Sequence, residues 1–466
     1  MKINKFIIFS LVLMCGLTFG QSVFADDVLD KKDLTDLFNV KSFLLDTTYG
    51  EVAGNDVYVS LGWEANTSET SRTRIFVSND ANSWRDAADY PTFITASALL
   101  RSVVYQDGIF VAVGTKHIAG KGKPLILKST DGENWEEVDE DLAEDYVGDA
   151  PLFSVSYGQG KFLAVGYQKE AGDPKKPFIL KSSNGENWSE VDSYPAGSIG
   201  KGIELSSVTY GDDGFVAVGS YYNTIVNKYF VSLMRSSNGE SWFMVNDTPS
   251  GIVNGNLSSV AYGNGRYFAV GKQSDSSESK QIPLSLVSFD GIYWSEVESY
   301  PFELGYFNSI TFADGFFAMT AYHDVPTLAP ILFRDNLKGL VPLAFAFDAD
   351  PGQPGYSVIK TRDANSWSEQ RYPQEETLLS INFANGLVFA TGGQEDKSPL
   401  LRAGILSFLE NGSSGGSTGN SNSKILGTRF CSEEVTTFCR ERPSATSLIP
   451  LYSEILNLIG QILVLL

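Results

Sequence analysis

Apolar runs and turn residues follow one another in a pattern that repeats along most of the chain. Four segments align without gaps, each starting at a serine and ending at a glycine twelve positions later: residues 102–114, 154–166, 207–219 and 259–271. Their first residues lie 52, 53 and 52 positions apart. Weaker copies start at Ser309 and Ser380, and a first copy with a four-residue insertion starts at Asp46. The pattern predicts seven units of about 52 residues between residues 46 and 410.

Each unit predicts four antiparallel strands. The aligned segments form two β-rich runs around a polar turn with glycine, and the second run, as at residues 110–114, is apolar throughout, which is typical of a strand covered on both faces. A third run follows a variable loop, as at residues 124–128, and a fourth opens with tryptophan, as at residues 135–138. Four strands in every unit predict an all-β fold, a seven-bladed β-propeller with four-stranded blades.

The last unit is incomplete. After Ser380 it lacks the tryptophan that opens the fourth run of the other units. An unpaired edge strand is a liability for a sheet. We therefore expect residues 28–45 to supply the outer strand of this unit and so close the ring.

The turn between the third and fourth runs is the most regular feature of the sequence. Six copies fit the pattern [Ser/Thr]-x-[Asp/Asn]-[Gly/Ala]-x-x-Trp. The acid or amide side chain is expected to accept backbone N–H groups across the turn, and the tryptophan is expected to bury its ring between neighbouring sheets. These predicted structural turn residues are Asp80, Asp131, Asn184, Asn238, Asp290 and Asp363, with Trp84, Trp135, Trp188, Trp242, Trp294 and Trp367.

With these turns, residues 46–410 resemble the BNR/Asp-box repeat propellers, the group that includes the sialidases. The usual Asp-box has one more residue between the acid and the tryptophan, so the turns here are a shortened variant. In that family the box is a structural corner on the face opposite the ligand site. The resemblance thus implies that the twelve turn residues are structural, and that ligands bind at the loops after the second and fourth strands.

Those loops vary from unit to unit, as expected of binding loops on a rigid frame. Two interpretations of their tyrosines stay open: stacking on sugar rings, or ordinary Tyr-Pro turns with packing. Their lysines are either an anion site or solvated charges. The sixth unit is longest, and its extra residues, within 322–356, are either a specificity loop or an inert excursion. The candidate ligand-face residues are Tyr90, Tyr194, Tyr300, Tyr372, Lys123 and Lys176.

Catalytic residues are not marked by the sequence. Sialidases grip a substrate carboxylate with three arginines, and the first normally lies in an aromatic-Arg-aliphatic-Pro motif. The corresponding residues 44–49 contain no arginine, and Arg72, Arg101 and Arg371 lie near suitable loops without forming a recognisable triad. The chain has only two histidines, so a metal site with several histidine ligands is not expected. We expect no cofactor and no metal.

Composition narrows the function further. The net charge of −21 argues against nucleic acid as a partner, because phosphate binding needs basic surface. The sequence therefore favours a non-catalytic module that binds a glycan or a protein through the variable loops. The alternatives are a glycoside-processing, sialidase-like enzyme with an atypical site, and an envelope scaffold or assembly factor.

The two ends predict export. Residues 1–25 have two early lysines, an apolar stretch and a Val-Phe-Ala cleavage site, which are typical of a signal peptide. Residues 26–410 form the propeller, and residues 411–423 are a Gly/Ser-rich flexible linker. The protein is expected to be secreted, periplasmic or displayed on the surface of a Gram-negative bacterium.

The tail at residues 424–466 has its own features. Cys431 and Cys439 are either one small disulfide loop or a free pair. Residues 449–454 resemble the opening of IPTL-type C-terminal sorting signals, although the arginine cluster of those signals is missing. A short C-terminal helix is expected, either apolar and sorted to the membrane, or amphipathic and bound to a membrane surface or a partner.

Overall fold

A computed structural model describes only part of the chain. The described residues are 30–32, 42–65, 71–91, 98–138, 142, 145–191, 193–194, 202–275, 277, 279–297, 300–323, 355–364, 367–371, 376–394 and 399–404. The chain divides into two units, residues 1–408 and 409–466, and every described residue belongs to the first. The predicted signal peptide, linker, tail helix, Cys431, Cys439 and Tyr372 all lie outside the described residues.

The described strands pair into four-stranded antiparallel sheets, and six of these sheets use four consecutive strands. In chain order they begin with β2 (Ser42–Val52), β3 (Asn55–Ala65), β4 (Ser71–Ser78) and β5 (Arg85–Asp86), then β6 (Ala98–Gln106), β7 (Ile109–Ile118), β8 (Lys121–Ser129) and β9 (Glu136–Glu137). The next two sheets are β10 (Leu152–Gly158), β11 (Lys161–Gln168), β12 (Lys176–Ser182) and β13 (Ser189–Glu190), then β14 (Ile203–Gly211), β15 (Gly214–Asn223), β16 (Lys228–Ser236) and β17 (Phe243–Met244). They are followed by β18 (Asn256–Gly263), β19 (Arg266–Ser274), β20 (Gln281–Ser288) and β21 (Ser295–Glu296), then β22 (Gly305–Ala313), β23 (Phe316–His323), β24 (Gly355–Thr361) and β25 (Trp367–Arg371).

A further sheet joins the two ends of the propeller. It contains β26 (Glu376–Ala384), β27 (Leu387–Gln394) and β28 (Pro399–Gly404), and its outer strand is β1 (Asp30–Lys32). β1 runs antiparallel to β28, with Asp30 opposite Ala403. This confirms that residues near the N-terminus supply the strand that the last unit lacks.

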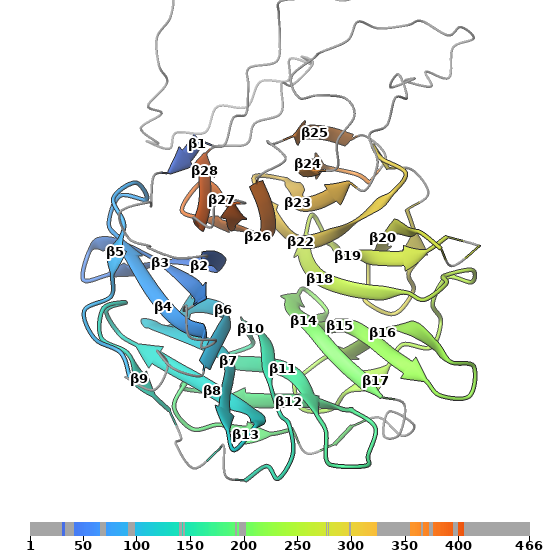
Figure 1. The fold of residues 1–466 in the computed structure, drawn as a ribbon, viewed down its shortest axis with the longest axis horizontal. Helices are drawn as coiled ribbons and strands as arrows, with labels where there is room; N and C mark the ends of the chain where they lie inside the picture. The colour runs from blue at the N-terminus through green and yellow to red at the C-terminus, as the bar shows by residue number, and fades with distance from the viewer. Residues whose placement is uncertain are drawn as a thin grey trace, which may run out of the picture. The chain divides into compact units, whose positions relative to one another are not determined.

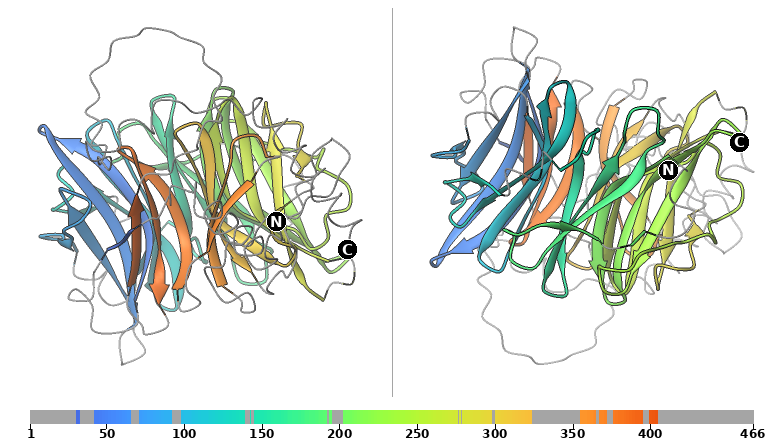
Figure 2. Two further views of the ribbon diagram at one scale, coloured as in Figure 1. Left: turned by 90° about the horizontal axis from the view of Figure 1, so that it is seen from above. Right: turned by 90° about the horizontal axis from the view of Figure 1, so that it is seen from below.

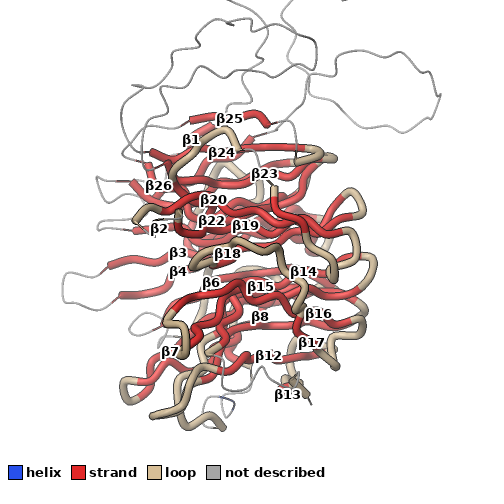
Figure 3. The backbone as a smooth tube through the Cα atoms, turned by 90° about the vertical axis from the view of Figure 1, so that its right-hand side faces the viewer, coloured by secondary structure: helices blue, strands red, loops and turns tan. Residues whose placement is uncertain are grey.

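The sheets follow one another around a central axis (Figure 1). Their first strands, β2, β6, β10, β14, β18, β22 and β26, each contact the next, and β26 contacts β2. Seen from above and below, neighbouring sheets pack face to face (Figure 2), and the described residues contain strands and loops but no helix (Figure 3). The prediction of an all-β propeller with four-stranded blades is therefore confirmed.

The hydrophobic core lies between neighbouring sheets. Leu61 and Ile75 of the first sheet are fully buried and belong to one cluster with Leu100, Phe110 and Leu125 of the second. The second strand of each sheet is buried on both faces, which explains its unbroken apolar sequence. Each sheet thus buries its apolar faces mainly against its two neighbours.

The six repeated turns have the predicted geometry where the structure describes them fully. Asp131 Oδ1 accepts the N–H groups of Glu133 and Asn134, both at 2.8 Å. Trp135 is 5% exposed, and its Nε1 donates to the carbonyl of Gly132 at 2.8 Å. Asp80, Asn184, Asn238 and Asp290 make the same pair of bonds to backbone N–H groups. At Asp80, the N–H groups of Ser83 and Asn82 lower the pKa of the carboxyl to about 2.

A serine links each of five inner strands, β6, β10, β14, β18 and β22, to the next one. Ser154 Oγ accepts the N–H of Val208 at 3.3 Å, so the hydroxyl of one sheet binds the backbone of its neighbour. We call these bonds the serine links. The other four are Ser102 to Val155, Ser207 to Val260, Ser259 to Ile310 and Ser309 to Ile381, at 3.2–3.3 Å.

Asp46 takes the place of this serine in the first sheet. Its Oδ2 accepts the N–H of Val103 in β6 at 2.8 Å, and its Oδ1 accepts Asn382 Nδ2 of β26 at 2.6 Å. The side chain thus binds both neighbouring inner strands at the position where the ring closes. It is buried, and burial outweighs these hydrogen bonds and raises the pKa of the carboxyl to about 6.

Replacement of a turn acid tests the role of the repeated turns in stability. Asp131→Ala removes the acceptor of two backbone N–H groups and should lower the free energy of unfolding by roughly 1–2 kcal/mol. Trp188→Ala should cost more, roughly 3–5 kcal/mol, because it empties a buried site between sheets. Urea unfolding measures both, with Thr130→Ala, an exposed side chain of the same turn, as the control. A cost for Asp131→Ala no larger than for Thr130→Ala would contradict the assignment.

Asp46 predicts a specific pH dependence. Its carboxyl has an ordinary pKa of 3.8 in the unfolded chain and about 6 in the folded one. The folded state therefore binds the proton more tightly, and this stabilisation is complete below pH 3.8 and lost as pH rises through 6. Relative to Asp46→Asn, which cannot titrate, the natural protein should gain about 2 kcal/mol between pH 7.5 and 4.5. Urea unfolding of both proteins at the two pH values measures the gain, and a pH-independent difference would show that Asp46 is charged throughout.

Candidate functional site

The loops between second and third strands lie at the opposite end of the sheets from the repeated turns, because successive turns of an antiparallel sheet alternate between its two ends. We call this end the variable-loop face. Among the described residues it carries the connections at residues 119–120, 169–175 and 224–227, together with the starts of the inner strands. Side chains at the ends of these strands are therefore the ones that a ligand on this face would meet.

A β-bulge interrupts every inner strand one residue before its serine or aspartate. In β6, Leu100 lies opposite Gly114 and Ser102 opposite Val113, so Arg101 has no partner in the ladder. A bulge of this kind turns a side chain out of the regular alternation. The bulged residues are Leu45, Arg101, Phe153, Ser206, Ser258, Asn308 and Leu379.

The bulge also explains the glycine that lies opposite it, within the second strand. A Cβ atom at Gly114 would lie 2.0 Å from the carbonyl oxygen of Leu99, and one at Gly166 would lie 1.9 Å from that of Pro151. Only glycine allows this close approach of the two backbones. The repeated glycine is therefore part of the device that directs the bulged side chains.

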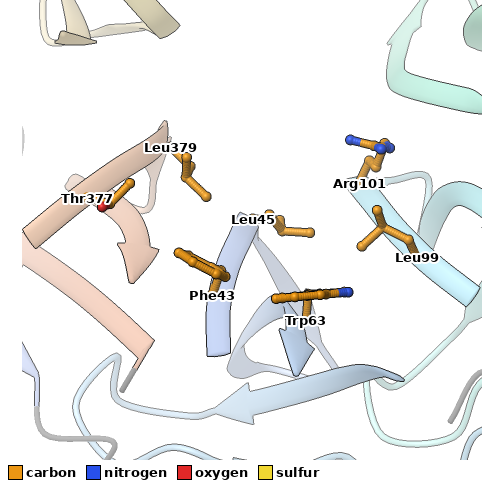
Figure 4. A pocket seen from close by; sticks show the side chains of 7 residues that line it. All are labelled: Phe43, Leu45, Trp63, Leu99, Arg101, Thr377 and Leu379. Carbon is orange, nitrogen blue, oxygen red and sulfur yellow. The ribbon is translucent and has the colours of Figure 1, made fainter. Parts of the chain in front are cut away.

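Three bulged residues line a hollow of about 360 Å³ where the last sheet meets the first (Figure 4). Arg101 lies at one end, Thr377 and Leu379 at the other, and the rings of Phe43 and Trp63 lie between them. These two rings are opposite each other in the ladder, with centroids 5.6 Å apart. The complete lining is Phe43, Leu45, Trp63, Leu99, Arg101, Thr377 and Leu379.

Arg101 is the charged side chain of the hollow. Its guanidinium lies over the ring of Phe153, 5.0 Å from the centroid, and within the described residues no carboxylate pairs with it. The acid that attracts it, Glu204, forms an ion pair with Lys175 instead. Although the side chain is accessible to solvent, the surrounding protein partly desolvates it and lowers the pKa of the guanidinium.

Aromatic pairs continue around the variable-loop face. Phe153 and Tyr167 have ring centroids 5.8 Å apart, and Lys175 Nζ lies 4.0 Å from the centroid of Tyr167. Most of these rings are half-buried and Tyr229 is 51% exposed, so each offers part of its surface. We call the set the aromatic arc: Phe153 with Tyr167, Tyr221 with Phe230, Tyr222 with Tyr229, and Tyr322 with Tyr306 and Tyr356.

The tyrosines selected from the sequence lie elsewhere. Tyr194 donates to Glu190 Oε1 at 2.8 Å and accepts the N–H of Ile179 at 3.0 Å, and Tyr300 accepts the N–H of Ser285 at 2.8 Å. Both rings pack on core clusters, as does Tyr90, and burial raises the pKa of Tyr194 and Tyr300. The packing interpretation of the Tyr-Pro pairs thus replaces the ligand-stacking one for these residues.

The selected lysines are not a common anion site. Lys123 is 8% exposed, and its Nζ donates to the carbonyl of Tyr146, so it is an internal anchor. Lys176 is half-buried and lies opposite Gln168 in the ladder. Most of the long excursion within 322–356 lies outside the described residues.

His323 forms the one contact in the described residues that resembles a catalytic constellation. Its Nε2 contacts both Ser357 Oγ at 2.6 Å and Glu369 Oε1 at 2.8 Å, whereas a triad needs the acid and the serine on different ring nitrogens. Ser357 is fully buried, and Glu369 also accepts Arg371 Nε at 3.2 Å. Equivalent ties join a second strand to an outer one in other sheets: Lys116 to Glu137, Gln168 to Glu190 and Gln273 to Glu296. His323 is therefore a structural tie.

Two of the three arginines considered from the sequence have described side chains, and these two belong to different contacts. Arg371 belongs to the His323 tie, and Arg101 lies in the hollow. The side chain of Arg72 lies outside the described residues. Within the described ranges there is no cluster of three His, Cys, Asp or Glu residues suited to a metal ion, and no helix able to cross a membrane.

Comparisons with known proteins find similarities of fold only. No protein-family model and no curated protein matches the sequence. The β-propeller domain of the Trilobed protease from Pyrococcus furiosus is 11% identical, with 78% of this chain and 95% of that one covered and a TM-score of 0.44. An α-L-arabinofuranosidase from Fusarium graminearum is 12% identical over 66% and 93%, with a TM-score of 0.42. The Trypanosoma rangeli sialidase is 12% identical over 79% and 55%, with a TM-score of 0.41.

Proposed function

We propose that this chain is an exported, non-catalytic β-propeller of seven blades that binds a glycan through its variable-loop face. The observation that carries the proposal is the aromatic arc. Its rings are partly exposed and held at the ends of paired strands. Aromatic faces suit the apolar C–H surfaces of sugar rings. Rings held by a rigid sheet also lose little conformational entropy on binding.

The arrangement of the arc suits a ligand with several rings. The rings of Tyr221 and Phe230 stack, with their centroids 5.3 Å apart and an angle of 17° between their planes. The two residues lie opposite each other in the hairpin of β15 and β16. Tyr306, Tyr322 and Tyr356 lie two sheets further along the ring. Sites so far apart favour an oligosaccharide or a glycan chain over a single sugar.

The described lining of the hollow has no pair of carboxylates, and this favours binding over catalysis at that place. Glycosidases generally need two carboxylates that flank the scissile bond. The described lining of the hollow contains no acid, and Glu204 is held by Lys175. A glycoside-processing enzyme and an envelope scaffold remain the competing functions, and the experiment below separates them.

The count of blades and the location belong to the same proposal. The contacts of β26 with β2 and the pairing of β1 with β28 support a closed ring of seven sheets. The signal peptide pattern supports export, and the tail resembling a sorting signal supports association with the membrane or cell surface.

A glycan array together with a fluorogenic glycoside panel tests the function. We expect array binding without turnover. For a glycan so identified, Tyr229→Ala and Tyr306→Ala should each weaken binding by about tenfold, or about 1.4 kcal/mol, because each removes an exposed part of the arc. Tyr293→Ala, an equally exposed tyrosine at a repeated turn, is the matched control and should bind normally.

Two other results would each replace the proposal. Turnover of any glycoside would identify an enzyme. Neither binding nor turnover would favour the scaffold. Equal loss in Tyr293→Ala and Tyr229→Ala would move the binding site away from the variable-loop face.

A further inference from the structure

The geometry points to a second kind of ligand in the hollow between the last and first sheets. We propose that this hollow binds an amphipathic carboxylate, with its apolar body against Trp63, Leu45 and Leu379 and its carboxylate on Arg101. This site adjoins the aromatic arc, because Arg101 contacts Phe153, but its lining contains no residue of the arc and it does not depend on the glycan proposal.

The lining suits an apolar body better than a sugar ring. Phe43, Leu45, Leu99 and Leu379 carry no side-chain hydrogen-bonding group, Trp63 carries one N–H and Thr377 one hydroxyl. A sugar hydroxyl that leaves water without a new partner costs roughly 1–3 kcal/mol. The apolar part of the lining offers such hydroxyls few partners, whereas a hydrocarbon or aromatic body gains by leaving water. The volume of about 360 Å³ lies at the small end of the range typical of small-molecule sites.

Arg101 adds a second requirement for the ligand, which is a negative charge. The guanidinium is partly desolvated, and the described residues provide it with no ion-pair partner. Arginine stays charged even so, because the guanidinium is the most basic side-chain group. Glu204 attracts it without forming an ion pair, so an approaching carboxylate could still bind the guanidinium directly.

The shape of the guanidinium favours a planar, two-oxygen anion. Its carbon lies 5.0 Å from the centroid of the Phe153 ring, and no carboxylate within the described residues pairs with it. The N–H groups lie in the plane of the guanidinium and remain available at its edge. A carboxylate matches two of these N–H groups in parallel, which a single hydroxyl cannot do.

The bulges explain why the two requirements meet at one place. Leu45, Arg101 and Leu379 are the bulged residues of three neighbouring inner strands. Each is turned out of the ladder at the same level of the ring, so an arginine and two leucines lie around a single hollow. At the same position β14, β18 and β22 have Ser206, Ser258 and Asn308. Ser258 and Asn308 donate to backbone carbonyls at 2.8 Å. Two apolar bulged side chains, Leu45 and Leu379, therefore lie together on the side of the ring where the hollow is.

A matched pair of probes tests the proposal with the full chain. We would titrate the protein with 4-phenylbutyrate, its neutral amide 4-phenylbutyramide, and glucuronate, using isothermal titration calorimetry. The acid should bind at least tenfold more tightly than the amide, because only the acid pairs with Arg101. It should also bind at least tenfold more tightly than glucuronate, which has the same anionic group on a polar body.

Two variants locate the effect. Arg101→Gln should remove the preference for the acid over the amide. Arg266→Gln is the control, because Arg266 also lies over a phenylalanine ring, at 5.3 Å from the centroid of Phe289, but belongs to the repeated-turn end. It should keep the preference, and thermal unfolding checks that both variants are folded.

Several results would overturn the proposal. Equal binding of acid and amide by the natural protein would exclude the ion pair, whatever the variants do. Glucuronate binding as tight as that of phenylbutyrate would exclude the apolar body. A preference that survives Arg101→Gln would place the anion elsewhere. Glycan binding that persists in Arg101→Gln leaves the proposed function standing, so the two proposals fail separately.

Discussion

The rest of the structure depends on a hydrogen bond between neighbouring inner strands. In each serine link, the hydroxyl of one sheet accepts a backbone N–H of the next, as Ser154 does from Val208. A single such bond contributes only about 1 kcal/mol. Repeated around a ring, however, these bonds set the distance between inner strands and so the level at which all the bulges lie. The bulges in turn decide which side chains meet at the axis, including Arg101 and Leu379.

Ring closure is where this arrangement differs from a simple repeat. In the other sheets all four strands are consecutive in the chain, whereas β1 and β28 of the last sheet are far apart in the sequence and are joined by their pairing. Near this closure Asp46 replaces the serine and binds both β6 and β26. The repeated turns meanwhile fasten the opposite end of the other six sheets. With both constraints at fixed positions, the loops of the variable-loop face are free to differ between units without loss of the frame.

The propeller frame could be predicted from the sequence because the residues that form it recur in every unit or nearly every unit. The serine, the closing glycine and the Asp/Asn-to-Trp turn recur at constant spacing, and so does the gap that β1 fills. The candidate site could not be predicted in the same way. Arg101 and Leu379 reach the hollow only because a bulge breaks the alternation of the strand, and alternation is what a sequence pattern assumes. Residue type alone made the tyrosines next to proline candidates for ligand stacking. Tyr194 and Tyr300 are instead covered by packing against core clusters, which no local sequence pattern shows. The aromatic residues just after the closing glycine, Trp63 and Tyr167, were the available signal.

Native-state hydrogen exchange tests most directly whether the closed inner ring is the basis of the structure. The informative amides are those bound by the side chains described above, Val103 by Asp46 and Val208 by Ser154. If Asp46 holds its neighbours as firmly as the serine links hold the other inner strands, both amides should exchange only through global unfolding, with the same free energy. Exchange at Val103 through a local opening of much lower free energy, with Val208 still fully protected, would show that the inner ring opens at Asp46 and would contradict this account.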